Sequence, residues 1–128
     1  MQQNLLDTHA LIWYLNGDAE LSQPARVSIE AEDAINFVSI ASLWEMAVKI
    51  SLGKLELKTP FSEIRKQIEE NGFEVLPVTF EDVLTVSTLP FHHRDPFDRI
   101  IIVQSFTNGL TIISKDRNFA LYNATVLW

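Results

Sequence analysis

The sequence contains no cysteine, only 4 glycines and 5 prolines in 128 residues, and no long apolar segment. The absence of thiols excludes disulfides, thiolate metal sites and cysteine nucleophiles, so any metal ion must be bound by oxygen or imidazole ligands. No segment approaches the roughly 18 consecutive apolar residues that a membrane span needs. The stretch Met1–Asn4 has neither the basic nor the apolar part of an export signal. We therefore expect a cytoplasmic protein with no membrane partner.

Hydrophobic residues make up 47% of the chain, which is enough to form a substantial core at this length. The sequence shows no internal repeat, low-complexity tract or linker at which a second domain would begin. We therefore predict one domain that spans residues 1–128.

Positive charge is scarce, with 10 Lys and Arg against 17 Asp and Glu. The net charge of −7 argues against a nucleic-acid partner, because phosphate binding usually requires a basic surface. However, the acidic cluster at residues 30–33 is far in sequence from most of the cations, many of which stand beside the carboxylates described below. A carboxylate site also becomes less negative when it binds divalent cations. The charge balance therefore does not exclude nucleic acid.

Two kinds of apolar segment alternate along the chain. The strand-like segments are short and rich in β-branched or aromatic residues, and they lie at 4–6, 34–38, 73–78, 110–114 and 124–127. The segments with helical spacing, caps or helix-stop residues lie at 9–15, 24–31, 42–52, 60–71, 80–87 and 96–108. This alternation predicts an α/β fold, with a mostly parallel sheet of about five short strands and helices on both faces.

The run Ile100–Val103 can be interpreted in two ways. Its β-branched residues favour a strand, whereas Asp95-Pro96 before it and Asn108-Gly109 after it are typical of the start and the end of a helix. We predict a buried helix here.

Four carboxylates follow predicted strands or stand near predicted helix starts, namely Asp7, Glu45, Asp98 and Asp116. Helix capping can explain each of them singly: Asp7 and Asp116 stand where an N-cap is expected, and Glu45 completes a capping box with Ser42. Asp98 stands three residues after Asp95, the predicted cap of its helix. For Glu45 and Asp98 taken alone, capping is the favoured explanation.

Capping does not explain why all four carboxylates belong to one side of the predicted sheet. Asp7 and Asp116 follow parallel strands, whose carboxyl ends share an edge, and the helices with Glu45 and Asp98 start at that edge as well. Without a cation the four groups would repel and raise one another's pKa. Mg²⁺ or Mn²⁺, which prefer carboxylate and water oxygens, would make this arrangement favourable.

A divalent cation at this edge predicts phosphodiester hydrolysis, because it can lower the pKa of a water molecule and neutralise charge on a phosphate. We expect Asp7 and Asp98 to be the most direct metal ligands. Glu45 would be a ligand or the base that orients the attacking water, and Asp116 would bind a second or weaker ion. The Thr8 hydroxyl would bond a metal-bound water or the Asp7 carboxylate.

Three cations near these carboxylates are candidate phosphate contacts. Lys49 follows Glu45 by one helical turn and can either contact phosphate or form an i,i+4 ion pair with Glu45. Arg94 and Arg99 flank Asp98 and have the planar donors that suit a phosphate backbone, although solvated surface charge is the ordinary role of such residues.

The histidines His9, His92 and His93 are not expected to bind metal, because none has a ligand partner three or four residues away on a helix. The aromatic residues Trp13, Tyr14 and Trp44 are expected in the core first, at an interface second and as stacking platforms for bases third.

Four segments resemble, in order and approximate spacing, the signature of PIN-domain nucleases, and they lie at 5–9, 42–45, 93–99 and 112–116. The likeness is greatest to the VapC-like toxins of type II toxin–antitoxin pairs. It implies a PIN-like α/β/α sandwich and a metal-dependent endoribonuclease that cleaves single-stranded RNA. It also implies a homodimer that a small VapB-like antitoxin silences.

In the family that this sequence resembles, the acidic positions match Asp7, Glu45, Asp98 and Asp116, with a Ser or Thr after the first, as Thr8 is here. Asp95 competes with Asp98 for the third position. We assign Asp95 as the helix cap, because in similar proteins the acidic residue inside the first helical turn faces the metal.

The helix predicted at 42–52 carries apolar residues on two stripes, so it must bury two faces. Packing between layers of the core is the favoured explanation, and a subunit interface or antitoxin groove is the other.

Two other functions remain open from the sequence. A phosphatase or phosphoacceptor would use Asp7 as a nucleophile, but the second acidic residue that such sites place near the first is absent here. A PIN-like domain without catalysis could bind RNA or protein, but it would have no use for mutually repelling carboxylates.

Overall fold

The computed structural model describes residues 2–128; Met1, the first residue of the predicted domain, lies outside the described residues. Five strands form one sheet in the order β3-β2-β1-β4-β5, and each neighbouring pair is parallel. The strands are β1 (Gln3–Leu6), β2 (Ile35–Ser39), β3 (Glu74–Leu76), β4 (Thr111–Ile113) and β5 (Val126–Leu127). The predicted α/β fold with a parallel sheet is confirmed.

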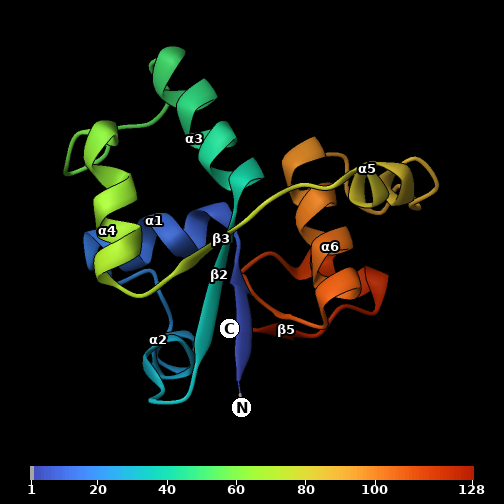
Figure 1. The fold of residues 1–128 in the computed structure, drawn as a ribbon, viewed down its shortest axis with the longest axis horizontal. Coiled ribbons are helices and arrows are strands. Elements are labelled where there is room, and N and C mark those ends of the chain that lie inside the picture. The colour runs from blue at the N-terminus through green and yellow to red at the C-terminus, as the bar shows by residue number, and fades with distance from the viewer. Residues whose placement is uncertain (1) are drawn as a thin grey trace.

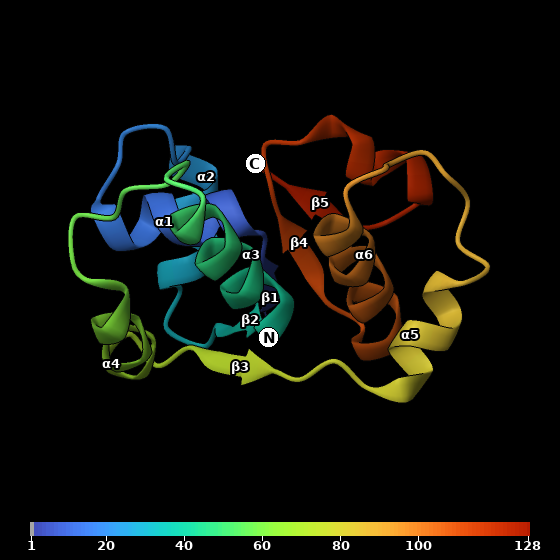
Figure 2. The ribbon, with the colours of Figure 1, turned by 90° about the horizontal axis from the view of Figure 1, so that it is seen from above.

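Helices cover both faces of this sheet (Figures 1 and 2). One layer contains α1 (Thr8–Asn16), α2 (Gln23–Glu30), α3 (Ile40–Ser51), η1 (Phe61–Glu63) and α4 (Ile64–Glu70). The other contains α5 (Phe80–Val86), α6 (Pro96–Asn108) and η2 (Arg117–Tyr122). No helix within residues 2–128 is long and apolar enough to cross a membrane.

The two layers are held to the sheet by alternate side chains of the same strands, because successive residues of a strand point to opposite faces. Leu6 and Ile113 belong to the core cluster on the side of α1 to α4. Their neighbours Leu5 and Ile112 belong to the cluster on the side of α6 and η2. The expected α/β/α sandwich is therefore present.

The ambiguous run Ile100–Val103 lies inside α6, as predicted from the residues that flank it. Asp95 caps the start of the helix, and Gly109 ends it with a left-handed φ of 64°. Ile101 and Ile102 are fully buried against the sheet, which explains why the run is as apolar as a central strand.

Two of the predicted helices differ by more than one residue from those in the structure. The helix expected at 42–52 begins at Ile40, and Ser39 rather than Ser42 caps it by accepting a hydrogen bond from the backbone N–H of Ala41. The helix expected at 60–71 is divided into η1 and α4. In both places the sequence contains more than one residue suited to begin a helix.

The position of β1 in the sheet indicates where a ligand would bind. From β1 the chain builds β2 and β3 on one side, and it returns to add β4 and β5 on the other side. The strand order therefore changes direction between β1 and β4, and ligands of open parallel sheets bind at the carboxyl ends of the strands at such a point.

Candidate active site

Asp7 directly follows β1 and is buried, with 5% of the residue exposed. One carboxylate oxygen accepts a hydrogen bond from the backbone N–H of Ala10 at 2.8 Å, so Asp7 caps α1. The other oxygen accepts a hydrogen bond from the Ser114 hydroxyl at 2.6 Å. Burial raises the pKa of Asp7, and these two hydrogen bonds oppose the rise. The same residue therefore serves as a helix cap and as a buried site carboxylate.

The Thr8 hydroxyl donates a hydrogen bond to Oε1 of Glu45 at 2.6 Å. The expected bond from Thr8 to the Asp7 carboxylate is therefore wrong, whereas the alternative of a bond to a metal-bound water stays a prediction. Glu45 lies on α3 and is buried, and its Oε2 is 2.7 Å from the Nζ of Lys49. The capping-box explanation of Glu45 is wrong, since the Ser42 hydroxyl has no hydrogen-bond partner among the described residues.

Asp95 and Asp98 have different positions at the start of α6, as the sequence suggested: Asp95 caps the helix and Asp98 lies in its first turn. Asp95 is the N-cap of α6 and accepts hydrogen bonds from the backbone N–H groups of Phe97 at 2.9 Å and Asp98 at 3.0 Å. The Asp98 carboxylate faces the other carboxylates. Burial, together with the smaller effects of the charges of Asp95, Asp7, Glu45 and Asp116, raises the pKa of Asp98 to about 8.

Asp116 follows β4 and caps η2 by accepting a hydrogen bond from the backbone N–H of Asn118 at 2.9 Å. Its own backbone N–H donates to the Ser114 hydroxyl oxygen at 2.9 Å. Because Ser114 also donates to Asp7, this one serine connects the ends of β1 and β4. The sequence contained Ser114 inside a matched segment, but it gave no reason to assign it a role.

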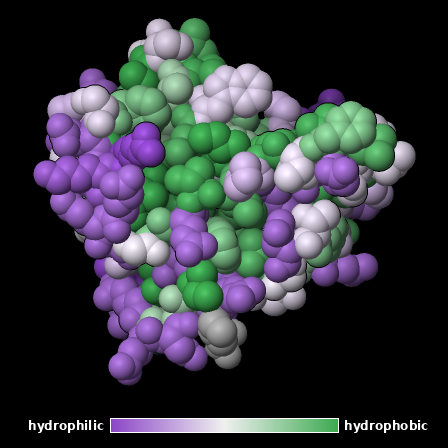
Figure 3. All heavy atoms as spheres, in the orientation of Figure 1, coloured by the Kyte–Doolittle hydropathy of each residue, from purple (hydrophilic) through white to green (hydrophobic). Residues whose placement is uncertain are grey.

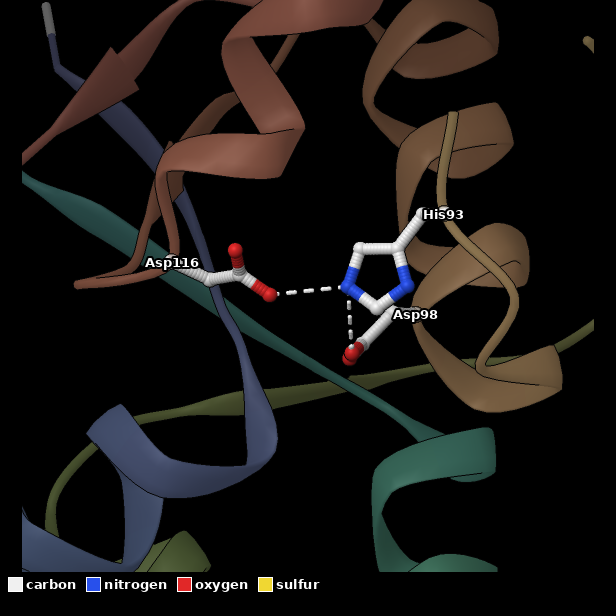
Figure 4. Close-up of side chains that lie close together, drawn as sticks. All are labelled: His93, Asp98 and Asp116. Carbon is white, nitrogen blue, oxygen red and sulfur yellow. Dashed lines mark hydrogen bonds and ion pairs between the residues drawn. The ribbon is translucent and has the colours of Figure 1, made fainter. Parts of the chain in front are cut away.

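His93 lies between two of the carboxylates, as Figure 4 shows. Its Nε2 is 2.8 Å from Oδ2 of Asp116 and 3.1 Å from Oδ2 of Asp98. The sequence analysis did not expect a role for His93, because it sought ligand pairs on helices and this residue stands in the loop before α6. The one available signal was its place at the start of the segment 93–99.

The hydrogen bonds of His93 define which ring nitrogen carries a proton when the ring is neutral. Its Nδ1 accepts a hydrogen bond from the backbone N–H of Asp95 at 3.2 Å, so Nδ1 is unprotonated. Nε2 must then carry the hydrogen, and it donates toward Asp116. A metal-binding histidine usually has the opposite pattern, in which its second nitrogen donates. His93 therefore acts as a donor that joins two carboxylates.

Arg99 is not a surface residue, and this corrects its assignment as a phosphate contact. It is 5% exposed, and its guanidinium donates to the carbonyl oxygens of Val86, Leu89, Pro90 and His93 at 3.0 to 3.3 Å. The guanidinium also stacks 4.1 Å from the centre of the Phe91 ring. These contacts hold the loop that carries His93 against α6. Arg94, by contrast, is exposed.

The donor atoms of the site fit a divalent cation. Glu45, Asp95 and Asp98 form one group in which the potential ligand atoms lie within 4.8 Å of one another, and Asp98 and Asp116 form a second such group with His93. In the second group the two carboxylates are the candidate ligands, because the Nε2 of His93 carries a hydrogen in the arrangement described above. The raised pKa of Asp98 also favours a bound cation, because the surroundings of this carboxylate do not compensate its negative charge. A set dominated by carboxylate oxygens suits Mg²⁺ or Mn²⁺.

The sequence matches the PIN domain family over residues 5–124. The chain belongs to the PIN domain family. No curated protein matches the sequence significantly. The resemblance drawn from the four sequence segments is thus confirmed at the level of the family.

Solved structures show the same fold as this PIN domain. A chain of VapBC2 from Rickettsia felis, bound to a DNA fragment from its promoter, has a TM-score of 0.73 at 13% identity, with 98% of each chain covered. A chain of a toxin-antitoxin complex from Klebsiella pneumoniae has a TM-score of 0.66 at 20% identity, covering 98% of this chain and 96% of that one. The PIN domain endonuclease Utp24 has a TM-score of 0.53 at 14% identity, covering 94% and 76%.

Proposed function

We propose that this PIN domain is a Mg²⁺- or Mn²⁺-dependent endoribonuclease that cleaves single-stranded RNA, and that it is the toxin of a toxin–antitoxin pair. The observation that carries the proposal is the convergence of Asp7, Glu45, Asp98 and Asp116 at the carboxyl ends of β1 and β4. Membership of the PIN family and the fold shared with the endonuclease Utp24 support nuclease chemistry.

Each residue has a defined part in this proposal. Asp7 and Asp98 would be the main metal ligands, Glu45 a ligand or the base that orients water, and Asp116 a ligand of a second or weaker ion. The bound ion would polarise the phosphodiester and lower the pKa of the attacking water. Thr8 would hold Glu45 in place through its 2.6 Å hydrogen bond. Lys49 and Arg94 would contact the RNA backbone from the edge of the site.

An apolar pocket of about 510 Å³ supports a protein partner. It lies between α3 and α5, beside the start of α6, and its walls include Ile40, Trp44, Val83 and Phe97. Figure 3 shows hydrophobic atoms spread over this region. Trp44 is 65% exposed although it packs edge-on against Phe97, the residue before Asp98. We assign the pocket to an apolar segment of a small VapB-like antitoxin, which would then lie next to the metal ligands.

Two further parts of the proposal are that the protein is a homodimer and that it acts in the cytoplasm, where RNA and antitoxin would both be present. Analytical ultracentrifugation of the isolated chain tests the first part. Co-purification with the product of a neighbouring small reading frame tests the antitoxin, and Trp44→Lys should weaken that complex. A complex unaffected by Trp44→Lys would contradict docking at this pocket.

The nuclease proposal is tested with a labelled single-stranded RNA, with and without Mg²⁺ or Mn²⁺. We expect cleavage that excess EDTA abolishes and that Asp7→Asn or Asp98→Asn reduces by at least about a hundredfold, as expected for lost metal ligands. Glu32→Gln, which changes an exposed carboxylate elsewhere, is the matched control. Cleavage that persists in EDTA would exclude the metal mechanism.

The alternatives give different results in the same preparations. Phosphorylation of Asp7 by acetyl phosphate, without RNA cleavage, would favour a phosphoacceptor. Tight RNA binding by the wild-type protein, without cleavage in either metal, would favour a binding module.

A further inference from the structure

A second pocket of about 620 Å³ opens beside the carboxylates, on the side of β5. Ser114 and Asp116 form part of its wall, and Ser114 is the residue that donates to Asp7. The pocket is therefore continuous with the candidate active site. A polymer bound at the carboxylates has room to extend into it.

The walls of this pocket combine aromatic and cationic side chains. Trp128 lines it, and the Trp128 ring packs 5.7 Å from the ring of Trp13, which in turn lies 5.5 Å from the ring of His9. We call these three residues the aromatic row. Trp13 and Trp128 also pack against the main core cluster, which supports their rings from one side. His9 follows Thr8 on α1, so the aromatic row begins next to the candidate active site and extends from there to Trp128.

Lys115 and Arg117 supply positive charge at the same place, on either side of Asp116. Lys115 forms an ion pair with Glu20 at 3.0 Å, but both side chains are more than half exposed, so water screens the pair and a phosphate can replace Glu20. The Nζ of Lys115 also lies 5.9 Å from the centre of the Trp13 ring. Arg117 is exposed and forms no ion pair with any residue in the range 2–128.

Aromatic platforms beside cations are the usual means of binding single-stranded nucleic acid, since every base has a stacking face and every nucleotide a phosphate. The apolar pocket between α3 and α5 also has aromatic walls, but its lining cation, Arg99, is buried and bonded to backbone carbonyls, so that pocket suits a protein segment instead. We propose that the pocket at Trp128 is a nucleotide subsite. One unpaired base of the substrate stacks on Trp128, and Arg117 and Lys115 bind the adjoining phosphate. This inference rests on the proposed nuclease function.

The subsite also gives a physical reason for a preference for single strands. A base in a duplex is already stacked and paired, so its face is unavailable to Trp128 until the base is extruded at a cost in free energy. Single-stranded RNA needs no such step.

The test measures the affinity of a short single-stranded RNA for the protein in an Asp98→Asn background that prevents cleavage. The RNA is used intact and with one abasic residue at each position in turn. Trp128→Ala should weaken binding of intact RNA about tenfold, in the range known for stacked bases. With the abasic residue at the stacked position, the effect of Trp128→Ala should disappear.

Matched variants separate stacking from structure. Trp128→Phe retains an aromatic face and should keep most of the affinity. Phe80→Ala, which removes an exposed aromatic ring on α5, should leave the affinity unchanged. Arg117→Ala should weaken binding of every RNA equally and lower the slope of affinity against salt by about 1, as one lost phosphate contact does. Arg65→Ala on α4 is its control.

Unchanged affinity after Trp128→Ala in a folded protein would overturn the subsite. So would an equal loss with all abasic RNAs, or failure of Trp128→Phe to restore binding, because both indicate a structural role. If the Asp98→Asn parent binds no RNA and the wild type cleaves none, the proposed function fails together with the subsite. If the parent binds and the wild type cleaves, a negative result at Trp128 contradicts the subsite alone.

Discussion

Asp7 and Asp98 are carboxylates of one site, but their surroundings differ. Asp7 belongs to a strand half, which comprises Asp7, Thr8, Glu45 and Ser114, and it accepts hydrogen bonds from a hydroxyl and a backbone N–H. Asp98 belongs to a loop half, which comprises His93, Asp95, Asp98 and Asp116. Among residues 2–128, the Asp98 carboxylate contacts the Nε2 of His93 at 3.1 Å and shares it with Asp116.

This difference shows where a cation stabilises the protein most. Hydrogen bonds from the protein itself partly compensate the charge of Asp7, although burial still raises its pKa, whereas the charge of Asp98 is opposed by burial and by four other carboxylates. Without a metal ion, hydrogen bonds therefore compensate the carboxylate charge of the strand half better than that of the loop half. The predictions below follow from this contrast.

Removal of the two carboxylates should have equal effects on activity and opposite effects on stability. Asp7→Ala and Asp98→Ala should each reduce RNA cleavage by at least about a hundredfold. In EDTA at pH 8, Asp98→Ala should raise the melting temperature by a few degrees, because it removes an uncompensated charge, a change of about 1 kcal/mol. Asp7→Ala should lower it by a similar amount, because it removes a helix cap.

Thermal unfolding followed by circular dichroism measures both shifts, and Glu32→Gln serves as the neutral control. If Asp98→Ala destabilised the metal-free protein as much as Asp7→Ala, the two halves would be electrostatically alike. The contrast drawn above would then be wrong.

Arg99 tests the loop half in isolation, because it binds the carbonyls of the segment that carries His93. Arg99→Ala should lower the free energy of unfolding by about 3 kcal/mol, since it removes a buried charge that satisfies several acceptors. Arg65→Ala, at a side chain that is 91% exposed, should change it by less than about 0.5 kcal/mol. Urea denaturation measures both. A loss for Arg99→Ala no larger than for Arg65→Ala would contradict this role.

The role of Arg99 could not be predicted from the residues around it in the sequence. An arginine next to a polar loop is usually a surface residue, and no local pattern indicates that a loop will fold around it. Asp7 and Asp116 could be predicted because strand ends and helix caps are local features, and parallel strands place such ends together. The order of the strands, which locates the site between β1 and β4, depends on tertiary packing and could not be predicted.

Glu45 and His93 show, in two different ways, that the role of a residue cannot always be predicted from its neighbours in the sequence. Glu45 had a local explanation in the Ser42 capping box, and that explanation was wrong, because α3 starts one turn earlier at Ser39. His93 had no local explanation, because its partners lie outside the loop that carries it. Asp98 is in the first turn of α6, and Asp116 follows β4. When a site is assembled from segments that are far apart in the sequence, the residues around any one of them give little indication of its role.

The metal-free protein should become less stable as the pH rises. The pKa of Asp98 is about 8 in the folded protein, against an ordinary value of 3.8, so the folded protein keeps a proton that the unfolded chain loses. Stability conferred by this proton is fully present below pH 3.8 and is lost as the pH rises toward 8. Between pH 5 and 8 the free energy of unfolding should fall by on the order of 4 kcal/mol.

Urea denaturation in EDTA across this range measures the slope. Asp98→Asn should make it shallower, because the amide does not titrate, but should not abolish it, because burial also raises the pKa of Asp7. Glu32→Gln should leave it unchanged. Saturating Mg²⁺ should flatten it as well, since the ion stabilises the ionised carboxylate. An equal slope in Asp98→Asn would mean that another group is responsible.

The smallest expected effect concerns His93, which joins Asp98 and Asp116 as a hydrogen-bond donor. His93→Ala should weaken Mn²⁺ binding about tenfold, because the two carboxylates lose the group that aligns them, as with other outer partners of metal ligands. His93→Gln should retain most of the affinity, since its amide N–H can replace the Nε2–H. Titration calorimetry measures both, with His92→Gln at the neighbouring exposed position as the control.

The glutamine variant decides between the two roles open to this imidazole. As a direct ligand, His93 would supply a nitrogen lone pair that an amide N–H cannot replace, so His93→Gln would bind Mn²⁺ as weakly as His93→Ala. As a donor, its contribution survives the replacement. Because Nδ1 already accepts from the backbone of Asp95, ligation through Nε2 would require that hydrogen bond to break. We therefore expect rescue by glutamine, and its absence would reassign His93 from a donor to a ligand.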